Sequence, residues 1–175
     1  MLQRKTSLTL AMALVAGCVA IPNLSGAESQ EINRLLAETK SQAVQLASDA
    51  DSLQSFTRSS ISWQTYSKEL DSMKSHINAA GKLLTQLKDA EATGDPWQQE
   101  AIRRIEPLLK DMADNTTVTI KYLDANKNKI HSQEFKDLCE ANLDIANNLE
   151  SLISDFVNFG KAKARYEELK SKLEL

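Results

Sequence analysis

Residues 122–135, with the sequence YLDANKNKIHSQEF, contain the residue types of a calcium site. Three oxygen-bearing residues alternate as the first ligands of a twelve-residue calcium loop do: Asp124, Asn126 and Asn128. The loop's glycine is absent, and Glu134 stands one position too early. A shift of one residue turns its carboxylate by about 100° around the following helix, away from the ion. We therefore expect an Asn-rich turn between two helices, with Ser132 as an N-cap and no metal bound.

Other residue types that bind metals or attack substrates are few and scattered. The predicted helices place His76 and His131 roughly 20 Å apart, so the two histidines cannot share an ion. The sequence contains no C-x-x-C-H motif for covalent haem and no paired Glu-x-x-His motifs for a diiron site. Cys139 lies beside the apolar seam of its helix, where a small apolar role is usual. We expect no catalytic residue and no cofactor, and hence a protein that is not an enzyme.

Residues 1–27 predict an export signal. The positively charged MLQRK precedes the apolar run LTLAMALVAGCVAI, which is too short for a comfortable membrane span. Small residues in SGA fit ordinary signal-peptidase cleavage between Ala27 and Glu28. As an alternative, VAGC at 15–18 resembles a lipobox, in which Cys18 is lipidated and becomes the mature N-terminus. We expect a bacterial protein that is periplasmic or secreted, or anchored to a membrane through Cys18.

The charge and cysteine content of the chain after this signal argue against nucleic-acid binding and against an internal disulfide. Without Arg4 and Lys5, 19 of the 21 basic residues remain against 24 acidic ones, a net charge of −5. A mildly acidic chain with dispersed cations is a poor match for nucleic acid. Cleavage at Ala27 leaves Cys139 as the single cysteine, which excludes an internal disulfide. An apolar core must therefore hold the fold.

Hydrophobic periodicity predicts four long helices over about 29–58, 62–93, 96–127 and 132–172. The second helix has an unbroken alternation of three- and four-residue steps: Trp63, Tyr66, Leu70, Met73, Ile77, Ala80, Leu84 and Leu87. Only five glycines and three prolines interrupt the chain, and short connections make successive helices antiparallel neighbours. The predicted fold is all-α: an up-down-up-down antiparallel four-helix bundle at 28–175, preceded by the signal peptide at 1–27.

The breaks between the helices carry specific capping signals. In TGDP at 93–96, Gly94 suits a left-handed C-terminal cap, while Asp95 and Gln98 have the spacing of a capping box. Pro107 predicts a kink in the third helix. TTVTI at 116–120 is a weak helix former, so packing must override its propensity there.

The last predicted helix has two further features. Asn142 is the polar exception on an otherwise apolar seam, where a buried Asn can fix helix register. Gly160 is expected to loosen the helix before KAKARYEELKSKLEL. We interpret that tail as a solvated helix, which either packs on the bundle or projects from it.

Three segments of the sequence resemble a known group of proteins. PWQQEAIRRIEPLL, MADNTT and LISDFVNFG are similar to an uncharacterised family of exported, all-helical bacterial proteins of the Acidobacteria type, and the similarity covers most of the chain after the signal. That family has no assigned activity, so the resemblance implies a helical fold and export but no binding or catalytic residue.

These patterns favour an exported, non-enzymatic helical bundle that acts as a structural or protein-interaction module of the cell envelope. Its partner would be an unknown envelope protein, and a membrane only if Cys18 is lipidated. The alternative is a small-molecule carrier or sensor with a cavity between the helices. In that case Trp63, Tyr66 and Phe135 would line one end of the bundle, and Trp97 would lie at the opposite end.

Overall fold

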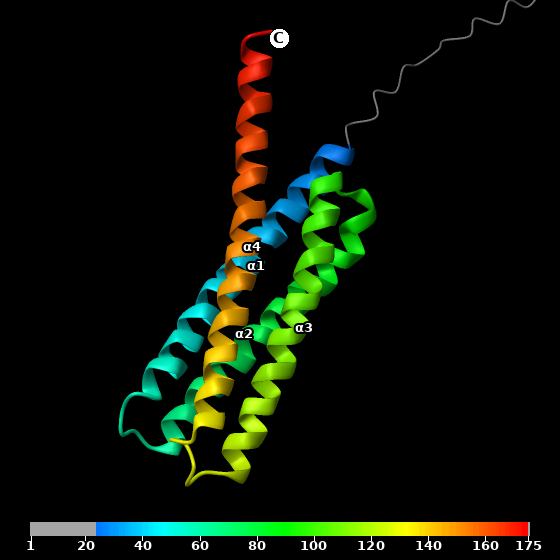
Figure 1. Ribbon diagram of the computed structural model, residues 1–175. Helices are drawn as coiled ribbons and strands as arrows, with labels where there is room; N and C mark the ends of the chain where they lie inside the picture. The colour runs from blue at the N-terminus through cyan, green and yellow to red at the C-terminus, as the bar shows by residue number, and fades with distance from the viewer. Residues whose placement is uncertain (1–23, 175) are drawn as a thin grey trace, which may run out of the picture.

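A computed structural model describes residues 24–174, with side chains from residue 29 onward. It contains α1 (Leu24–Phe56), α2 (Trp63–Ala90), a short 3-10 turn η1 (Glu91–Thr93), α3 (Pro96–Ala125) and α4 (Gln133–Lys172). The predicted all-α four-helix bundle is confirmed (Figure 1). Cys18 lies outside the described residues, and the predicted cleavage point falls within the first turns of α1, so the export signal stays a prediction.

Successive helices run antiparallel and form a closed ring. α1 packs against α2 and α4, and α3 packs against the same two helices. The beginning of α1, the α2–α3 connection and the end of α4 therefore lie at one end of the molecule (Figure 1). The α1–α2 and α3–α4 connections lie at the other end.

The core consists of one buried face from each of the four helices. On α1, seven apolar residues at helical spacing are buried: Ile32, Leu35, Leu36, Ala43, Leu46, Ala50 and Leu53. On α2, Trp63 and Leu84 are only partly buried, whereas the other six seam residues are buried. The third helix continues through Pro107, which is exposed, and through the threonine-rich segment that follows.

Threonine side chains fill the segment of α3 that has low helix propensity. The hydroxyls of Thr117 and Thr119 donate to the carbonyls of Ala113 and Asn115, respectively. Thr116 and Thr119 are also buried against α4. Packing against α4 thus overrides the intrinsic preference of these residues, as expected.

Two glycines have roles that differ from the predicted ones. Gly94 has φ −78° and ψ 155°, so it is extended rather than left-handed. The 3-10 turn η1 ends α2 instead, and a Cβ at Gly94 would lie 2.8 Å from Cδ1 of Ile32. Gly160 lies inside an uninterrupted α4, where a Cβ would lie 2.7 Å from Cη2 of Trp97. Gly160 leaves room for a rigid indole and Gly94 for the flexible end of the Ile32 side chain, and helical periodicity reveals neither contact.

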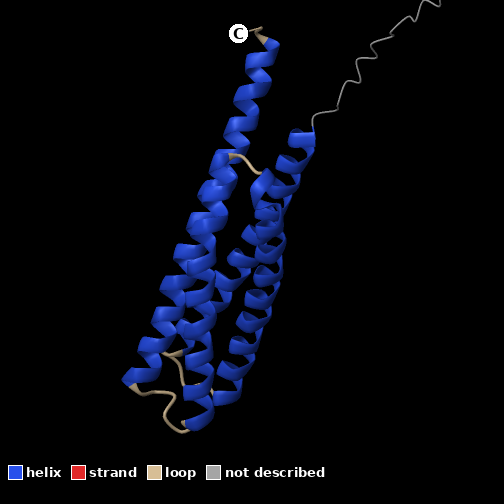
Figure 2. Ribbon diagram, turned by 90° about the vertical axis from the view of Figure 1, so that its right-hand side faces the viewer, coloured by secondary structure: helices blue, strands red, loops and turns tan. Residues whose placement is uncertain are grey.

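The end of α4 projects beyond the other helices (Figures 1 and 2). Every residue from 161 to 174 is exposed. Of the two alternatives for the tail, packing or projection, the structure therefore shows projection. We call residues 159–173 the α4 extension.

Candidate interaction surface

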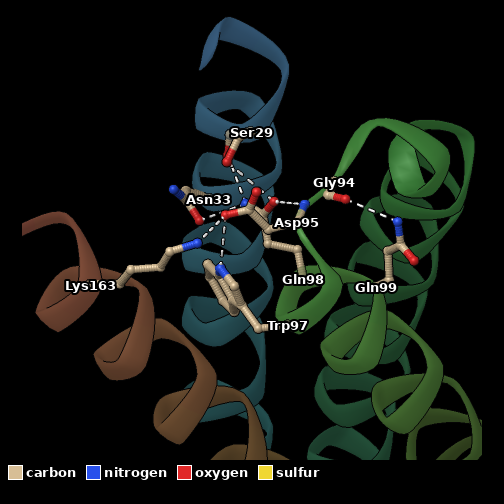
Figure 3. A network of polar contacts seen from close by, with 8 residues as sticks. All are labelled: Ser29, Asn33, Gly94, Asp95, Trp97, Gln98, Gln99 and Lys163. Carbon is tan, nitrogen blue, oxygen red and sulfur yellow. Dashed lines mark hydrogen bonds and ion pairs between the residues drawn. The ribbon is translucent and has the colours of Figure 1, made fainter. Parts of the chain in front are cut away.

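The base of the α4 extension is joined to α1 and α3 by a network of polar side chains (Figure 3). Gln98 is wholly buried at the start of α3, and its amide nitrogen donates to the carbonyl of Ser29 (2.8 Å) and to Oδ1 of Asn33 (2.9 Å). Its amide oxygen accepts from the Ser29 hydroxyl (3.2 Å) and from the backbone N–H of Asp95 (2.8 Å). One buried amide thus links the first turns of α1 and α3.

The predicted capping box at Asp95 and Gln98 is present. The Asp95 carboxylate also reaches the α4 extension, because Oδ2 accepts from Nζ of Lys163 at 2.5 Å and from Nε1 of Trp97 at 3.3 Å. Hydrogen bonding from Lys163 holds the pKa of Asp95 below its ordinary value. The pair is partly exposed, so it positions the extension more than it stabilises the fold.

An aromatic contact completes this joint between α3 and α4. The rings of Trp97 and Phe159 meet edge to face with centroids 5.4 Å apart. Trp97 also lies against Gly160, where the missing side chain leaves room for the indole. Past this contact, Lys163 pairs with Asp95, and Lys161 and Ala164 line a hollow with α1; all the described residues after Ala164 are exposed.

The α4 extension carries an exposed apolar stripe. Four large apolar side chains on it are about half exposed or more: Phe159 at 52%, Tyr166 at 62%, Leu169 at 48% and Leu173 at 64%. With Ala162, they follow steps of three, four, three and four residues. That spacing places all five on one face of a helix. Sequence periodicity contained this signal, but we interpreted the segment as a solvated tail.

Cations surround the stripe. Residues 161–172 contain five basic residues and only two acidic ones, Glu167 and Glu168. This segment therefore has a net charge of +3 in a chain whose overall charge is −3. The stripe and its cations are the chemical features that this end of the molecule offers to a binding partner.

The turn at 122–135 has the capping roles expected for it. Ser132 is the N-cap of α4, and its hydroxyl accepts from the backbone N–H of Phe135 at 3.3 Å. Asn126 ends α3, and its amide donates to the carbonyl of Tyr122. Across residues 24–174, no three His, Cys, Asp or Glu side chains are grouped so that they could hold a metal ion.

A polar cluster between α1 and α2 contains the residue types of a catalytic triad in a different arrangement. The hydroxyl of Ser72 donates to Oδ2 of Asp49 at 2.8 Å, and Nε2 of His76 lies 3.5 Å from the same oxygen. Nδ1 of His76 contacts Oε1 of Gln42 at 2.9 Å. Asp49 thus lies between serine and histidine, so the imidazole is not bonded to the hydroxyl that it would have to activate. Because the contacts join two helices, sequence spacing gave no sign of the cluster.

Cys139 and the aromatic residues lie in the core. Burial raises the pKa of the Cys139 thiol to about 12, which keeps it protonated and unreactive at neutral pH. Tyr66 and Phe135 are wholly buried and meet edge to face at 5.1 Å, as the expected end cluster requires. Trp63 instead lies at the margin, with Nζ of Lys127 4.2 Å from its ring centroid.

Two further rings complete the aromatic cluster. Phe56 contacts Tyr66 at 5.9 Å, and Tyr122 stacks on Phe135 at 5.9 Å. Neither ring was predicted to belong to the cluster. All these aromatic contacts fill the space that a carrier would need at this end of the bundle.

Hollows lie between helix pairs at the surface. The groove between α1 and α2, of about 650 Å³, is lined mainly by exposed polar residues such as Glu38, Asn78 and Lys82. A smaller hollow of about 170 Å³ lies between α1 and α4 beside Trp97 and Gly160. Ligand sites usually combine a volume of roughly 300–1,000 Å³ with a mainly apolar lining. Neither of these two hollows has both properties. A third hollow, of about 690 Å³ between α2 and α3, comes nearer through Ile77, Leu84 and Leu109, but it is an open groove at the surface beside Lys82, Glu106 and Lys110.

Within residues 24–174, no helix has a stretch long and apolar enough to span a membrane. Comparisons with protein-family models, with curated proteins and with solved structures find no match. The resemblance to exported all-helical bacterial proteins therefore stays a prediction. A functional proposal for this chain rests on its own geometry.

Proposed function

We propose that the protein is an exported, non-enzymatic helical bundle that acts as a protein-interaction module of the cell envelope. The observation that supports this proposal is the exposed apolar stripe of the α4 extension. A stripe at helical spacing on a projecting helix has the form of an unfilled helix-binding face. The four-helix bundle contacts only the first residue of this stripe, Phe159, through Trp97, and the buried core residues of α4 end at Val157.

The bundle is a rigid support for this face. Four helices bury a continuous apolar core, and the Asp95–Lys163 pair and the Trp97–Phe159 contact fix where the extension leaves it. A binding face on a supported helix loses less conformational entropy on association than a disordered tail would. This arrangement favours an interaction role over an unstructured C-terminal tail.

The alternative of a carrier or sensor with a cavity has weaker support. The predicted ring cluster is packed solid around Tyr66 and Phe135, and the hollows described above lie at the surface. The polar cluster around Asp49 and His76 supports no reaction in its observed arrangement. The interaction role is the function for which the geometry provides a surface.

Site-specific photo-crosslinking in cells that produce the full chain tests the proposal. A benzoylphenylalanine in place of Tyr166 should yield crosslinks to one or a few envelope proteins. The same group in place of Lys74, an exposed residue midway along α2, is the matched control. Absence of protein crosslinks at 166, or equal crosslinking at 74, would contradict the proposal.

Export is tested separately by mass spectrometry of the mature N-terminus. An N-terminus at Glu28 would place the protein in the periplasm or outside the cell. A diacylated N-terminus at Cys18 would anchor it to a membrane. An intact N-terminus beginning at Met1 would contradict export.

A further inference from the structure

We infer that the α4 extension pairs with an amphipathic helix of another protein, whose apolar seam is flanked by acidic residues, in a two-stranded coiled coil. This inference rests on the proposed interaction role and names the chemical class of the partner. Spacing, continuity with the bundle, and charge support it independently.

The spacing of the stripe is that of a coiled-coil seam. Phe159, Tyr166 and Leu173 recur every seven residues, and Ala162 and Leu169 stand three residues after the first two. These are the a and d positions of consecutive heptads. A stripe confined to a and d is narrow, as in a seam that meets one partner helix.

The seam continues a contact that α4 makes within the bundle. Leu138, Ile145, Leu152 and Phe159 form the same seven-residue series, and all but Phe159 are partly buried in the bundle. Leu152 shares a surface hollow with Leu108 of α3, and Phe159 contacts Trp97 near the start of α3. The series then continues to Tyr166 and Leu173, past the point where α3 begins. Within the bundle, α3 covers this side of α4. A partner helix on the extension would therefore cover the same side of α4 beyond the N-terminus of α3.

The residues that flank the seam are all cations over two heptads. Lys163 and Lys170 occupy the e positions, and Arg165 and Lys172 occupy the g positions. In a parallel pair of two copies, Arg165 of one chain would face Lys170 of the other. An antiparallel pair would also place cation against cation. Like charges at these positions oppose association, so a second copy is a poor partner.

Carboxylates of the chain itself already pair with two of these flanking cations. Asp95 binds Lys163 at 2.5 Å from across the α3–α4 joint, and Glu168 binds Lys172 at 2.5 Å. A partner with Glu or Asp at its own e and g positions would make the same kind of pair at Arg165 and Lys170. Such pairs mainly select the partner and its orientation, while the apolar seam provides most of the binding energy.

An anionic membrane surface is a second kind of partner for a cationic amphipathic helix. Helices that lie in membrane interfaces usually have a broad apolar face with bulky residues. Here the apolar residues of the extension's seam occupy only the a and d positions, and one of them is the small Ala162. Glu167 and Glu168 add carboxylates to the rest of the surface, so the observations favour a helical partner.

The test uses two synthetic helical probes with the full-length protein as produced after any processing. The acidic probe has three heptads with Leu at every a and d and Glu at every e and g. The basic probe has Lys at those flanking positions instead. Fluorescence anisotropy should show binding of the acidic probe, weakened at high salt, and at least tenfold weaker binding of the basic probe.

Substitutions then locate the binding face. Leu169→Glu should weaken binding of the acidic probe by tenfold or more. Ser171→Glu adds the same residue on the opposite face of the extension and should change binding by less than about threefold. Neither residue contacts another helix of the bundle, so both variants should keep the wild-type melting temperature.

A charge exchange tests the flanks. The double variant Arg165→Glu with Lys170→Glu should lose the acidic probe and gain affinity for the basic one. Failure of wild-type protein to bind the acidic probe, or equal affinity for both probes, would overturn the inference. So would unchanged binding by the Leu169→Glu variant.

Two further outcomes would assign the extension to another partner. Binding to vesicles rich in phosphatidylglycerol without affinity for the acidic probe would indicate a membrane surface. A dimer in analytical ultracentrifugation that Leu169→Glu abolishes would indicate a second copy. Either result overturns the inference, whereas protein crosslinks at position 166 with no binding of the acidic probe would leave the interaction role standing and reject only this partner class.

Discussion

At the scale of single residues, the buried side-chain amides of Asn142 and Gln98 each link two helices, at different positions along the bundle. Asn142 is wholly buried in α4, where its amide donates to Thr119 and to the carbonyl of Leu138 and its oxygen accepts from Thr116. Gln98 has an equivalent set of partners at the end of the bundle. The position of Asn142 was predictable because it breaks an apolar seam. Gln98 was predictable only as a cap, because its partners Ser29 and Asn33 lie on another helix.

Tyr66 offers a test of buried polar groups. Its hydroxyl is buried without a hydrogen-bond partner in the described part of the chain, and burial raises its pKa to about 12. An unsatisfied buried hydroxyl costs stability, so Tyr66→Phe should raise the free energy of unfolding by about 1 kcal/mol. Tyr122→Phe is the matched control, because that hydroxyl lies 2.8 Å from the Ser132 hydroxyl, and it should lower stability by about 1 kcal/mol. Urea unfolding measures both changes, and a loss of stability in Tyr66→Phe would contradict the prediction.

Asp95 makes stability depend on pH in a predictable direction. Its pKa is lowered in the folded protein, chiefly by the hydrogen bond from Lys163, so the folded state favours the ionised carboxylate. That contribution is complete above the unfolded pKa of about 3.9 and is lost as pH falls through the lower folded value. Between pH 5 and pH 2.5 the wild type should therefore lose more stability than Asp95→Asn. Thermal unfolding across this range is the measurement.

The control for this prediction removes the other partner. In a chain that carries Lys163→Gln, the substitution Asp95→Asn should hardly change how much stability is lost between pH 5 and pH 2.5. The reason is that the lysine is the main cause of the lowered Asp95 pKa. If Asp95→Asn changes the acid dependence equally with and without Lys163, the pair is not the origin of the effect. The pair is partly exposed, so the effect should also shrink at high salt.

At the scale of elements, the sequence predicts patterns along one helix but not the contacts between helices. Apolar periodicity predicted four helices and most of the buried residues of α1 and α2, because burying a stripe is what stabilises an amphipathic helix. On α4 several buried residues lie beside the predicted seam instead: Cys139, Ala146, Ile153 and Val157. The predicted roles of Gly94 and Gly160 were wrong or incomplete. Each position depends on a side chain from another helix, Ile32 for Gly94 and Trp97 for Gly160. The Asp49–His76 contact was missed for the same reason.

Two glycines in helices provide a pair of substitutions with opposite expected signs. Gly81 lies in α2 and a Cβ there would meet nothing within 4 Å, so Gly81→Ala should raise stability by about 0.5–1 kcal/mol. Gly160→Ala should lower it, because a Cβ 2.7 Å from Trp97 must displace the indole from Phe159 and Asp95. Chemical denaturation with tryptophan fluorescence reports both. Stabilisation by both alanines would show that the indole moves without cost.

At the scale of the whole molecule, the chain combines a closed bundle with an open helix. The closed part has its apolar faces covered on every side by the ring of four helices. The extension projects past this ring (Figure 2) and presents a second apolar face, of which the ring contacts only Phe159. The two parts also differ in charge, since residues 161–172 carry +3 and the remainder of the chain carries −6. Under the proposed function, stability and binding therefore belong to different parts of one polypeptide.

This division predicts a sharp contrast in amide hydrogen exchange. Amides in 164–172 form helical hydrogen bonds, but their residues are exposed and lack tertiary packing. An isolated helix of this length is marginal in water, so these amides should exchange within seconds. Amides in 116–123 belong to residues with weaker helix propensity but lie against the core, so they should be protected by orders of magnitude more. Saturation with the acidic helical probe should slow exchange in 164–172 and leave 116–123 unchanged. Equal protection of the two segments in the free protein would mean that the extension is already covered and has no face to offer a partner.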